Sequence, residues 1–79
     1  MKYYVYILQC ADSTYYTGIA KDLKQRLARH NSGHGARYTR GRLPVMLVYH
    51  EVSSNIRIAM RREREIRRLS RSRKQQLLQ

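Results

Sequence analysis

The sequence has no phenylalanine, no tryptophan, one cysteine and one proline among its 79 residues. A single cysteine excludes an internal disulfide framework and indicates a reducing compartment. Cys10 lies in an apolar run, which is typical of a small packed side chain rather than a reactive thiol. No apolar run is long enough to cross a bilayer, and the N-terminus shows no pattern of a cleaved signal. We therefore expect a cytoplasmic protein that does not bind membranes.

Acidic residues are also scarce. Five aspartates and glutamates face 17 lysines and arginines, which gives a formal net charge of +12. Such a surface repels itself, so a polyanionic partner is its natural explanation. Nucleic acid is favoured over an anionic membrane because no cationic segment resembles an independent interfacial helix. Nothing in the sequence indicates an obligate protein partner.

The length and the composition predict one small globular domain over residues 1–79. The chain is 42% apolar and 28% charged, which argues against disorder. Strands are expected at residues 3–9, 14–19 and 44–52, the last one buried on both faces because its apolar run is continuous. Helices are expected from Asp22 to Asn31 and from residue 54 or 55 to residue 70, and a basic turn or short helix should pack Leu77 and Leu78 on the core. Residues 32–42 should form a mobile cationic loop. The fold class is therefore α+β, with a three-stranded antiparallel sheet and the order β-β-α-β-α-(α).

Five of the seven tyrosines lie in residues 3–18, "YYVYILQCADSTYYTG". Tyrosine is favoured in strands, but a buried phenol needs a hydrogen-bond partner. If residues 11–13 form a three-residue loop, Leu8 pairs with Tyr16, and Tyr6 lies diagonally from Tyr16 on one face. A two-residue turn would put these tyrosines on opposite faces. The sequence lacks the Asn-Gly or Asp-Gly of the tight turn, so we expect the longer loop.

Polar residues interrupt the apolar faces of both helices. Arg26 and His30 share a face with two leucines in the first helix, where Arg26 could also lie at the edge and reach water. In the later helix the inward stripe is predicted to contain Ile56, Ala59, Met60, Glu63, Ile66 and Ser70. A carboxylate at the centre of such a stripe must be paired, protonated or bound to a metal. The pattern alone leaves open whether Glu63 forms a structural pair with an arginine or has a function.

These features together resemble the GIY-YIG nuclease superfamily. "YVY" at residues 4–6 matches Gly-Ile-Tyr, and "YTG" at residues 16–18 matches Tyr-Ile-Gly. "DLKQRLARHNSG" is similar to the arginine helix of the family and "AMRRERE" to its glutamate helix. The segment "HNSGHGARYTRGRLPVMLVYHE" is most similar to the small stand-alone bacterial branch, which is related to the catalytic domains of structure-selective junction endonucleases. The first motif departs from the family because Tyr4 replaces its glycine.

The resemblance implies an endonuclease that hydrolyses phosphodiester bonds, in DNA rather than RNA, with Mg²⁺ or Mn²⁺. Tyr6 matches the tyrosine proposed as general base, and His30 matches a residue sometimes proposed for the same task. Tyr16 corresponds to the tyrosine that positions water and phosphate, and Arg26 to the arginine that stabilises the charge on the phosphate. Glu63 matches the only protein ligand of the metal. One carboxylate completed by water suits magnesium, which sheds its hydration reluctantly.

Residues outside this set are candidates for substrate contacts. Arg37, Tyr38 and Arg40 lie in the cationic segment, where Tyr38 could stack on an unpaired base. Lys21 could replace a lysine that some relatives carry after the second motif, where this chain has Ile19. No further DNA-binding domain is recognisable, so these residues and the arginine helix would supply the affinity. A merely solvated loop is the alternative for the cationic segment.

Two other functions are alternatives to the nuclease. A nucleic-acid-binding module for DNA or RNA, with little or no catalysis, is the main alternative, although all five matched side chains are present. A zinc site made from Cys10, His30, His34 and His50 does not fit, because the spacings match no compact ligand pattern. The sequence does not indicate the preferred substrate structure, the pathway (for example DNA repair) or the oligomeric state.

Overall fold

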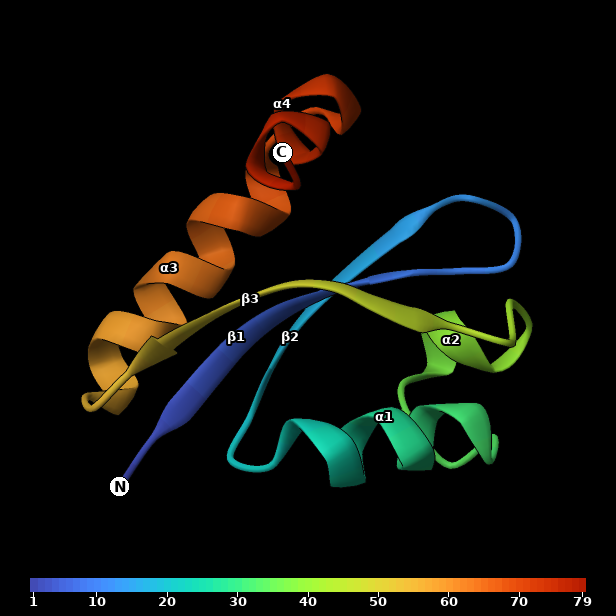
Figure 1. Ribbon diagram of the computed structural model, residues 1–79, viewed down its shortest axis with the longest axis horizontal. Helices are drawn as coiled ribbons and strands as arrows, with labels where there is room; N and C mark the ends of the chain where they lie inside the picture. Colours follow the sequence, from blue (N-terminus) through green and yellow to red (C-terminus); the bar gives the residue numbers. More distant parts are fainter.

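The computed structural model describes residues 1–79 as a three-stranded sheet with helices on both faces (Figure 1). In chain order the elements are β1 Tyr3–Gln9, β2 Tyr15–Ala20, α1 Leu23–Asn31, α2 Arg37–Arg40, β3 Met46–Ser53, α3 Ile56–Arg68 and α4 Arg71–Leu77. The strand order is β2-β1-β3, and both pairs are antiparallel. The predicted α+β class and the order of the main elements are confirmed.

The hairpin between β1 and β2 has the predicted register. The amide of Cys10 donates to the carbonyl of Thr14 at 2.8 Å, and Leu8 pairs with Tyr16. Asp12 closes the loop because its carboxylate accepts both the amide and the hydroxyl of Thr14, at 3.1 and 2.6 Å. Ser13 takes a left-handed conformation with φ of 69°. The longer loop thus places Tyr6 and Tyr16 on the same face of the sheet.

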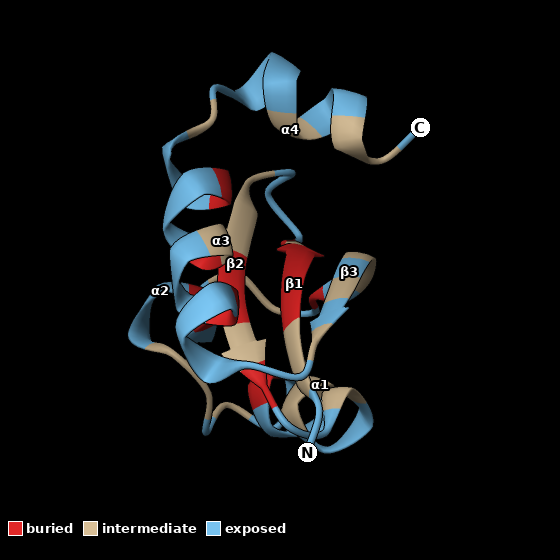
Figure 2. Ribbon diagram, turned by 90° about the vertical axis from the view of Figure 1, so that its left-hand side faces the viewer, coloured by how far each residue is buried: buried red, intermediate tan, exposed pale blue.

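Each face of the sheet has its own core. On one face Tyr6, Leu8, Cys10, Ala20 and Val45 are buried, and the leucines of α1 pack against them. On the other face the buried residues are Val5, Ile7, Ala59 and Ile66, with Leu77 and Leu78 packed alongside as predicted. Figure 1 shows α1 and α2 on one side of the sheet, and α3 and α4 on the other. The central strand β1, buried on both faces, is therefore the common support for both helical layers (Figure 2).

Capping residues fix where the two longer helices begin. The carboxylate of Asp22 accepts the amide of Gln25 at 3.0 Å, as the capping pattern predicts. Asn55 caps α3 by accepting the amides of Arg57 and Ile58. Helix α1 ends at Asn31, and Gly33 follows in a left-handed conformation with φ of 85°, which glycine adopts without strain. These caps set the phase with which each helix presents its side chains to the sheet.

Three predictions about burial and local structure were wrong. Strand β3 is not buried on both faces: it is an edge strand whose residues are all partly or fully exposed. The segment 32–42 is not only a loop, because it contains the short helix α2. Ile56 and Met60 of α3 are 40% and 45% exposed, so the inward stripe of this helix is narrower than its apolar pattern. Periodicity alone does not show how much of a helix the small sheet can cover.

Glu51 lies near the end of β3 and pairs with a residue of α3. Its carboxylate accepts three hydrogen bonds from the guanidinium of Arg62, at 2.8 to 3.0 Å, and the hydroxyl of Tyr49. These bonds lower the pKa of Glu51, mainly because Arg62 favours the charged form. The pair attaches α3 to the edge strand β3.

None of the helices in the fold combines the length and the apolar character that crossing a membrane requires.

Candidate active site

Three of the predicted site residues meet on the α1 face of the sheet. Tyr6 is 1% exposed, and its hydroxyl lies 3.0 Å from Nε2 of His30. The ring of Tyr16 lies close to both, with centroid distances of 6.4 Å to Tyr6 and 5.4 Å to His30. The hairpin register places the two tyrosines on this face of the sheet, and the phase of α1 directs the histidine toward them. The predicted proximity of Tyr6 and Tyr16 is therefore confirmed.

A residue that the sequence analysis did not select holds the other side of His30. Thr39, on α2, is fully buried, and its Oγ1 lies 2.9 Å from Nδ1 of His30. The same hydroxyl donates to the carbonyl of Ala36 at 2.9 Å. Gly35 packs against the imidazole so closely that a Cβ there would collide with Nδ1 and Cα of His30. The sequence carried no signal for this threonine, because the arginines and glycines around it indicated only a loop.

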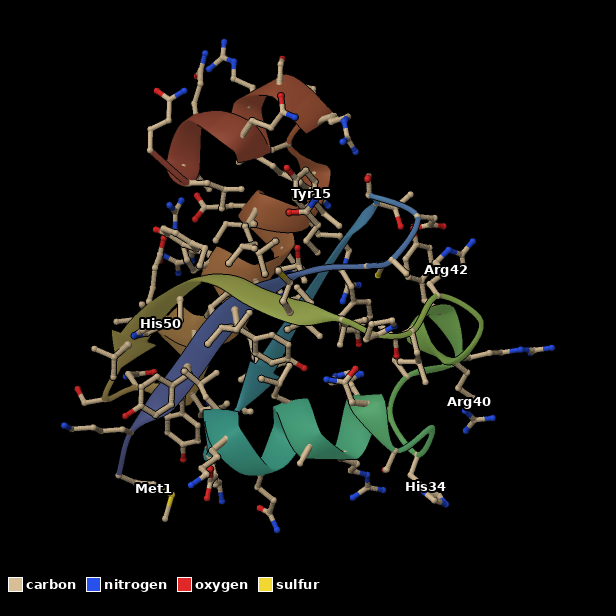
Figure 3. The ribbon with its side chains drawn as sticks, turned by 45° about the vertical axis from the view of Figure 1, so that its right-hand side comes forward. Met1, Tyr15, His34, Arg40, Arg42 and His50 are labelled. Carbon is tan, nitrogen blue, oxygen red and sulfur yellow. The ribbon has the colours of Figure 1, made fainter.

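Arg26 lies at the wall of an open pocket next to these groups. The pocket has a volume of about 340 Å³ and is lined by Tyr16, Arg26, Arg29, His30, His34, Gly35 and Ala36. Arg26 donates from Nη1 to the carbonyl of Ile19 at 3.2 Å, which holds its guanidinium against β2. Arg29 and His34 were not selected as site residues from the sequence, and Figure 3 shows His34 at the outer end of α1. The pocket is cationic and fits an anionic group such as a phosphate.

Burial and nearby charges keep the Tyr6–His30 pair neutral at rest. The pKa of Tyr6 is raised, first by burial and then by Tyr16, while Arg26 opposes this shift. The pKa of His30 is lowered, first by burial and then by Arg26 and Arg29. Because the two pKa values move apart, the proton stays on Tyr6 in the free protein. The neighbouring arginine alone does not produce a phenolate.

Glu63 is buried in α3, with 8% of its surface exposed. Its Oε2 is inaccessible to solvent and accepts no well-directed hydrogen bond, and its close partner is the guanidinium of Arg67 one turn later. The Arg67 side chain is 63% exposed, so it can move without disturbing the core. The structural arginine pair that the sequence left open is thus present, and it consists of one contact from an exposed guanidinium to a buried carboxylate oxygen.

Glu63 belongs to the helix layer on the opposite face from His30, yet its charge reaches the tyrosine. It contributes to the raised pKa of Tyr6, after burial and Tyr16. Both layers meet at the edge strand β2, which α3 also contacts. A second pocket at this edge, of about 260 Å³, is lined by Tyr15, Tyr16, Thr17, Tyr38, Arg67 and Lys74. Arg67, the partner of Glu63, therefore shares this pocket at the β2 edge with Tyr16.

The resemblance implies a divalent metal, which only certain sets of donor atoms can hold. No three histidine, cysteine, aspartate or glutamate side chains gather closely enough to hold a metal between them. Glu63 offers a single buried carboxylate whose Oε2 lacks a directed hydrogen bond. One carboxylate completed by water and substrate oxygens suits Mg²⁺ or Mn²⁺ and not a structural zinc. The residues present therefore fit the implied metal.

The residues predicted to contact nucleic acid lie in two separate regions of the structure. Arg37, Tyr38 and Arg40 lie on α2 beside the pocket, and Arg40 points away from the sheet (Figure 3). Tyr38 stacks on Tyr16, with centroids 6.1 Å apart, and the guanidinium of Arg42 lies 4.0 Å from the centre of its ring. A base would have to displace one of these neighbours to stack on Tyr38. Lys21 lies elsewhere, at the start of α1 and near the ring of Tyr3.

Gly18 on β2 provides the space that Tyr6 occupies. A Cβ on this glycine would lie 2.5 Å from the Tyr6 hydroxyl and 2.7 Å from its ring. We expect Gly18→Ala to lower the free energy of unfolding by about 1–3 kcal/mol, because overpacking a buried site forces its neighbours to shift. Chemical denaturation measures this. Gly41→Ala is the matched control, since no atom lies within 4 Å of its added Cβ, and equal stability losses would contradict the interpretation.

The fold and the site define the class of the protein. A tyrosine pair on a hairpin, an arginine and histidine on the next helix and a glutamate on a later helix are the elements of a GIY-YIG domain. Residues 2–76 match the family described as the GIY-YIG catalytic domain. The chain belongs to this family, as the resemblance predicted. GIY-YIG domains generally carry nuclease-type activity on nucleic acids and typically use divalent metals.

Within the family the chain is similar to UPF0213 proteins. It is 50% identical over 76 residues to a UPF0213 protein of Natronomonas pharaonis, which covers 96% of this chain and 89% of that protein. It is 47% identical over 77 residues to one of Staphylococcus saprophyticus, with 98% and 94% covered. The solution NMR structure of the UPF0213 protein BH0048 from Bacillus halodurans has a TM-score of 0.64 at 47% identity, with 99% of this chain and 83% of that chain covered. These names assign no substrate.

Proposed function

We propose that the protein is a divalent-metal-dependent endonuclease that hydrolyses phosphodiester bonds in DNA. The observation that carries the proposal is the buried contact between the Tyr6 hydroxyl and His30 Nε2 at 3.0 Å, set beside a cationic pocket. A phenol and an imidazole in contact can move a proton, and the pocket can bind the group that the deprotonated water attacks. This combination serves hydrolysis better than it serves binding alone.

The scissile phosphate would occupy the pocket between α1 and the Gly35–Ala36 segment. Arg26 borders this pocket, and its position next to Tyr16 lets it stabilise the charge that develops on the phosphate oxygens. Tyr16 orients the phosphate and the water, and the Tyr6–His30 pair receives the proton of that water. Glu63 would hold Mg²⁺ or Mn²⁺. The bound metal would supply Lewis-acid stabilisation of the phosphate oxygens.

A cleavage assay with purified protein tests the proposal. Branched, flapped, single-stranded and linear duplex DNA are incubated with Mg²⁺, with Mn²⁺ and with a chelator, and RNA of the same sequence is included. We expect metal-dependent cleavage of DNA. Binding of the same substrates without metal-dependent cleavage would support the non-catalytic module instead, and preferential cleavage of RNA would overturn the substrate assignment.

The arginines of α2 give a prediction about binding. Arg37→Gln with Arg40→Gln should reduce the slope of log affinity against log salt by about 1.8, because each phosphate contact on duplex DNA contributes about 0.9. Fluorescence anisotropy with duplex DNA at several salt concentrations measures the slope. The physical reason is the release of counterions from each phosphate that an arginine neutralises.

The control for this prediction removes equal charge from the opposite layer. Arg61 and Arg64 are exposed on α3, and neither lines the pocket. Arg61→Gln with Arg64→Gln should leave the salt slope unchanged. If both double variants reduce the slope equally, the contribution of α2 is only its net charge, and Arg37 and Arg40 do not contact phosphates.

A further inference from the structure

Thr39 is buried in a cationic segment of the chain. Its relative exposure is 0%, whereas its neighbours Tyr38 and Arg40 are exposed. No apolar cluster includes it. Its hydroxyl makes two hydrogen bonds, one with the carbonyl of Ala36 and one with the ring of His30, each 2.9 Å long. A buried side chain with both of its hydrogen bonds at the candidate site suggests a role in the chemistry.

The direction of these hydrogen bonds follows from the groups involved. A carbonyl oxygen only accepts, so the single hydrogen of the Thr39 hydroxyl is directed at Ala36. The Oγ1 atom must then act as acceptor toward His30, which requires a hydrogen on Nδ1. In a neutral imidazole the other nitrogen, Nε2, carries a lone pair. The hydroxyl of Tyr6 therefore donates to Nε2 over their 3.0 Å contact.

The surroundings of His30 favour this neutral form. The charged groups facing it are Arg26 and Arg29 on its own helix, and the rings of Tyr6 and Tyr16 contact it from β1 and β2. Burial and the two arginines lower its pKa. No carboxylate forms a hydrogen bond with the ring. The task of fixing the tautomer, which a carboxylate performs in many enzymes, falls here to the Thr39 hydroxyl.

We propose that Thr39 is a positioning residue that holds His30 as the Nδ1–H tautomer, so that the proton path of the proposed nuclease runs from water through the Tyr6 hydroxyl to His30 Nε2. The inference rests on the proposed function. It gives separate roles to Tyr6 and His30, which were both candidates for the general base. In this order Tyr6 is a relay and His30 is the final base. Gly35 assists, because the absence of a side chain lets the backbone pack against the imidazole.

The proton transfer balances without a free phenolate. As the water oxygen forms its bond to phosphorus, its proton passes to Oη of Tyr6, and the original phenolic proton passes to Nε2 of His30. The products of the transfer are a neutral phenol, an imidazolium and a phosphorus-bound hydroxyl, with the leaving oxygen taking the electron pair of the broken P–O bond. Release of the imidazolium proton to solvent restores the resting state. The relay avoids the separated phenolate–imidazolium pair that the diverging pKa values disfavour.

The tautomer is measured directly on the natural chain. Long-range ¹H–¹⁵N NMR spectra of the histidine rings show which nitrogen of His30 carries the hydrogen. We expect Nδ1 to be protonated and Nε2 to be bare at neutral pH. A hydrogen on Nε2 in the natural chain would overturn the role of Thr39, whatever the result of any cleavage assay.

Two variants then separate positioning from packing. Thr39→Val keeps the shape but removes the hydroxyl, and we expect a mixture of His30 tautomers and a loss of cleavage rate of about 10- to 100-fold, the usual effect of removing a group that orients a catalytic side chain. Thr39→Ser keeps the hydroxyl and should restore the Nδ1–H tautomer and most of the rate. Affinity for DNA should be the same in both variants, measured without metal.

The outcomes distinguish the failure of the inference from that of the proposed function. If the natural chain cleaves DNA and Thr39→Val cleaves at the same rate, the positioning role is wrong and the nuclease stands. If the natural chain does not cleave, the proposed function and the proton path fail, while the NMR spectra still decide what Thr39 does to His30. Should Thr39→Val not fold, the natural chain and Thr39→Ser carry the test, because loss of the Nδ1–H tautomer in either contradicts the inference.

Discussion

Glu63→Gln is expected to reduce metal-dependent cleavage by at least about 1,000-fold. Glutamine keeps the size of the side chain but removes the charge that would hold a divalent ion, and metal stabilisation of a phosphate commonly contributes several kcal/mol, with about 1.36 kcal/mol for each factor of ten in rate. Cleavage rates at saturating protein, with Mg²⁺ or Mn²⁺, measure the effect. Binding of DNA should persist, because the substitution removes a negative charge from a cationic surface.

The matched control for this substitution lies two residues away. Glu65 is 58% exposed and makes only a loose pair with Arg62 at 3.8 Å. Glu65→Gln removes the same charge from the same helix and should leave cleavage unchanged. Cleavage by Glu63→Gln at the natural rate would show that this carboxylate is a structural partner of Arg67 and that the proposed metal site is wrong.

Tyr6→Phe is expected to reduce cleavage by about 100- to 10,000-fold, the range that a positioned acid or base contributes. The ring and its packing remain, and the hydroxyl that faces His30 Nε2 is lost. Single-turnover cleavage measures the rate. The variant should also unfold more easily, by about 1–3 kcal/mol, since the buried imidazole nitrogen loses its partner.

Tyr4→Phe is the corresponding control on the same strand. Tyr4 is partly exposed and its ring makes an edge contact with His50, at a centroid distance of 5.9 Å, away from the pocket. Its loss of a hydroxyl should change neither the rate nor the stability appreciably. If Tyr6→Phe cleaves as fast as Tyr4→Phe, the phenolic proton takes no part in the reaction and His30 must act on water by another route.

Much of the architecture could be predicted because local signals agreed with one another. The Asp22 cap, the glycine after α1 and the absence of a tight-turn dipeptide in the hairpin each specify a local geometry. The hairpin register then put Tyr6 and Tyr16 on one face, and the helical period put His30 toward them. These predictions depend either on contacts between residues that are close together in the sequence or on the period of one helix. A single sequence shows both.

The failures concern long-range geometry. Whether β3 is central or at the edge depends on the strand order, which no local pattern of apolar residues reveals. The exposure of Ile56 and Met60 depends on how far the small sheet extends under α3. The role of Thr39 depends on a contact with His30 that exists only after α2 folds back on α1. A threonine among arginines and glycines has no sequence feature that separates it from a solvated loop residue.

The proposed site residues lie on both faces of the sheet, so activity can be lost by a change in the distance between the two faces. The phenol, the imidazole and Thr39 keep their mutual contacts within one layer, whereas the carboxylate is attached only to the other. Each part can remain intact while their separation changes. Ala59 is the fully buried residue of α3 that packs against Val5 and Ile7 of β1, so a bulky residue in its place would abolish activity without touching any reacting group. The distance between the two helical layers, which the sheet and its packing set, therefore decides whether the two parts can act on the same substrate.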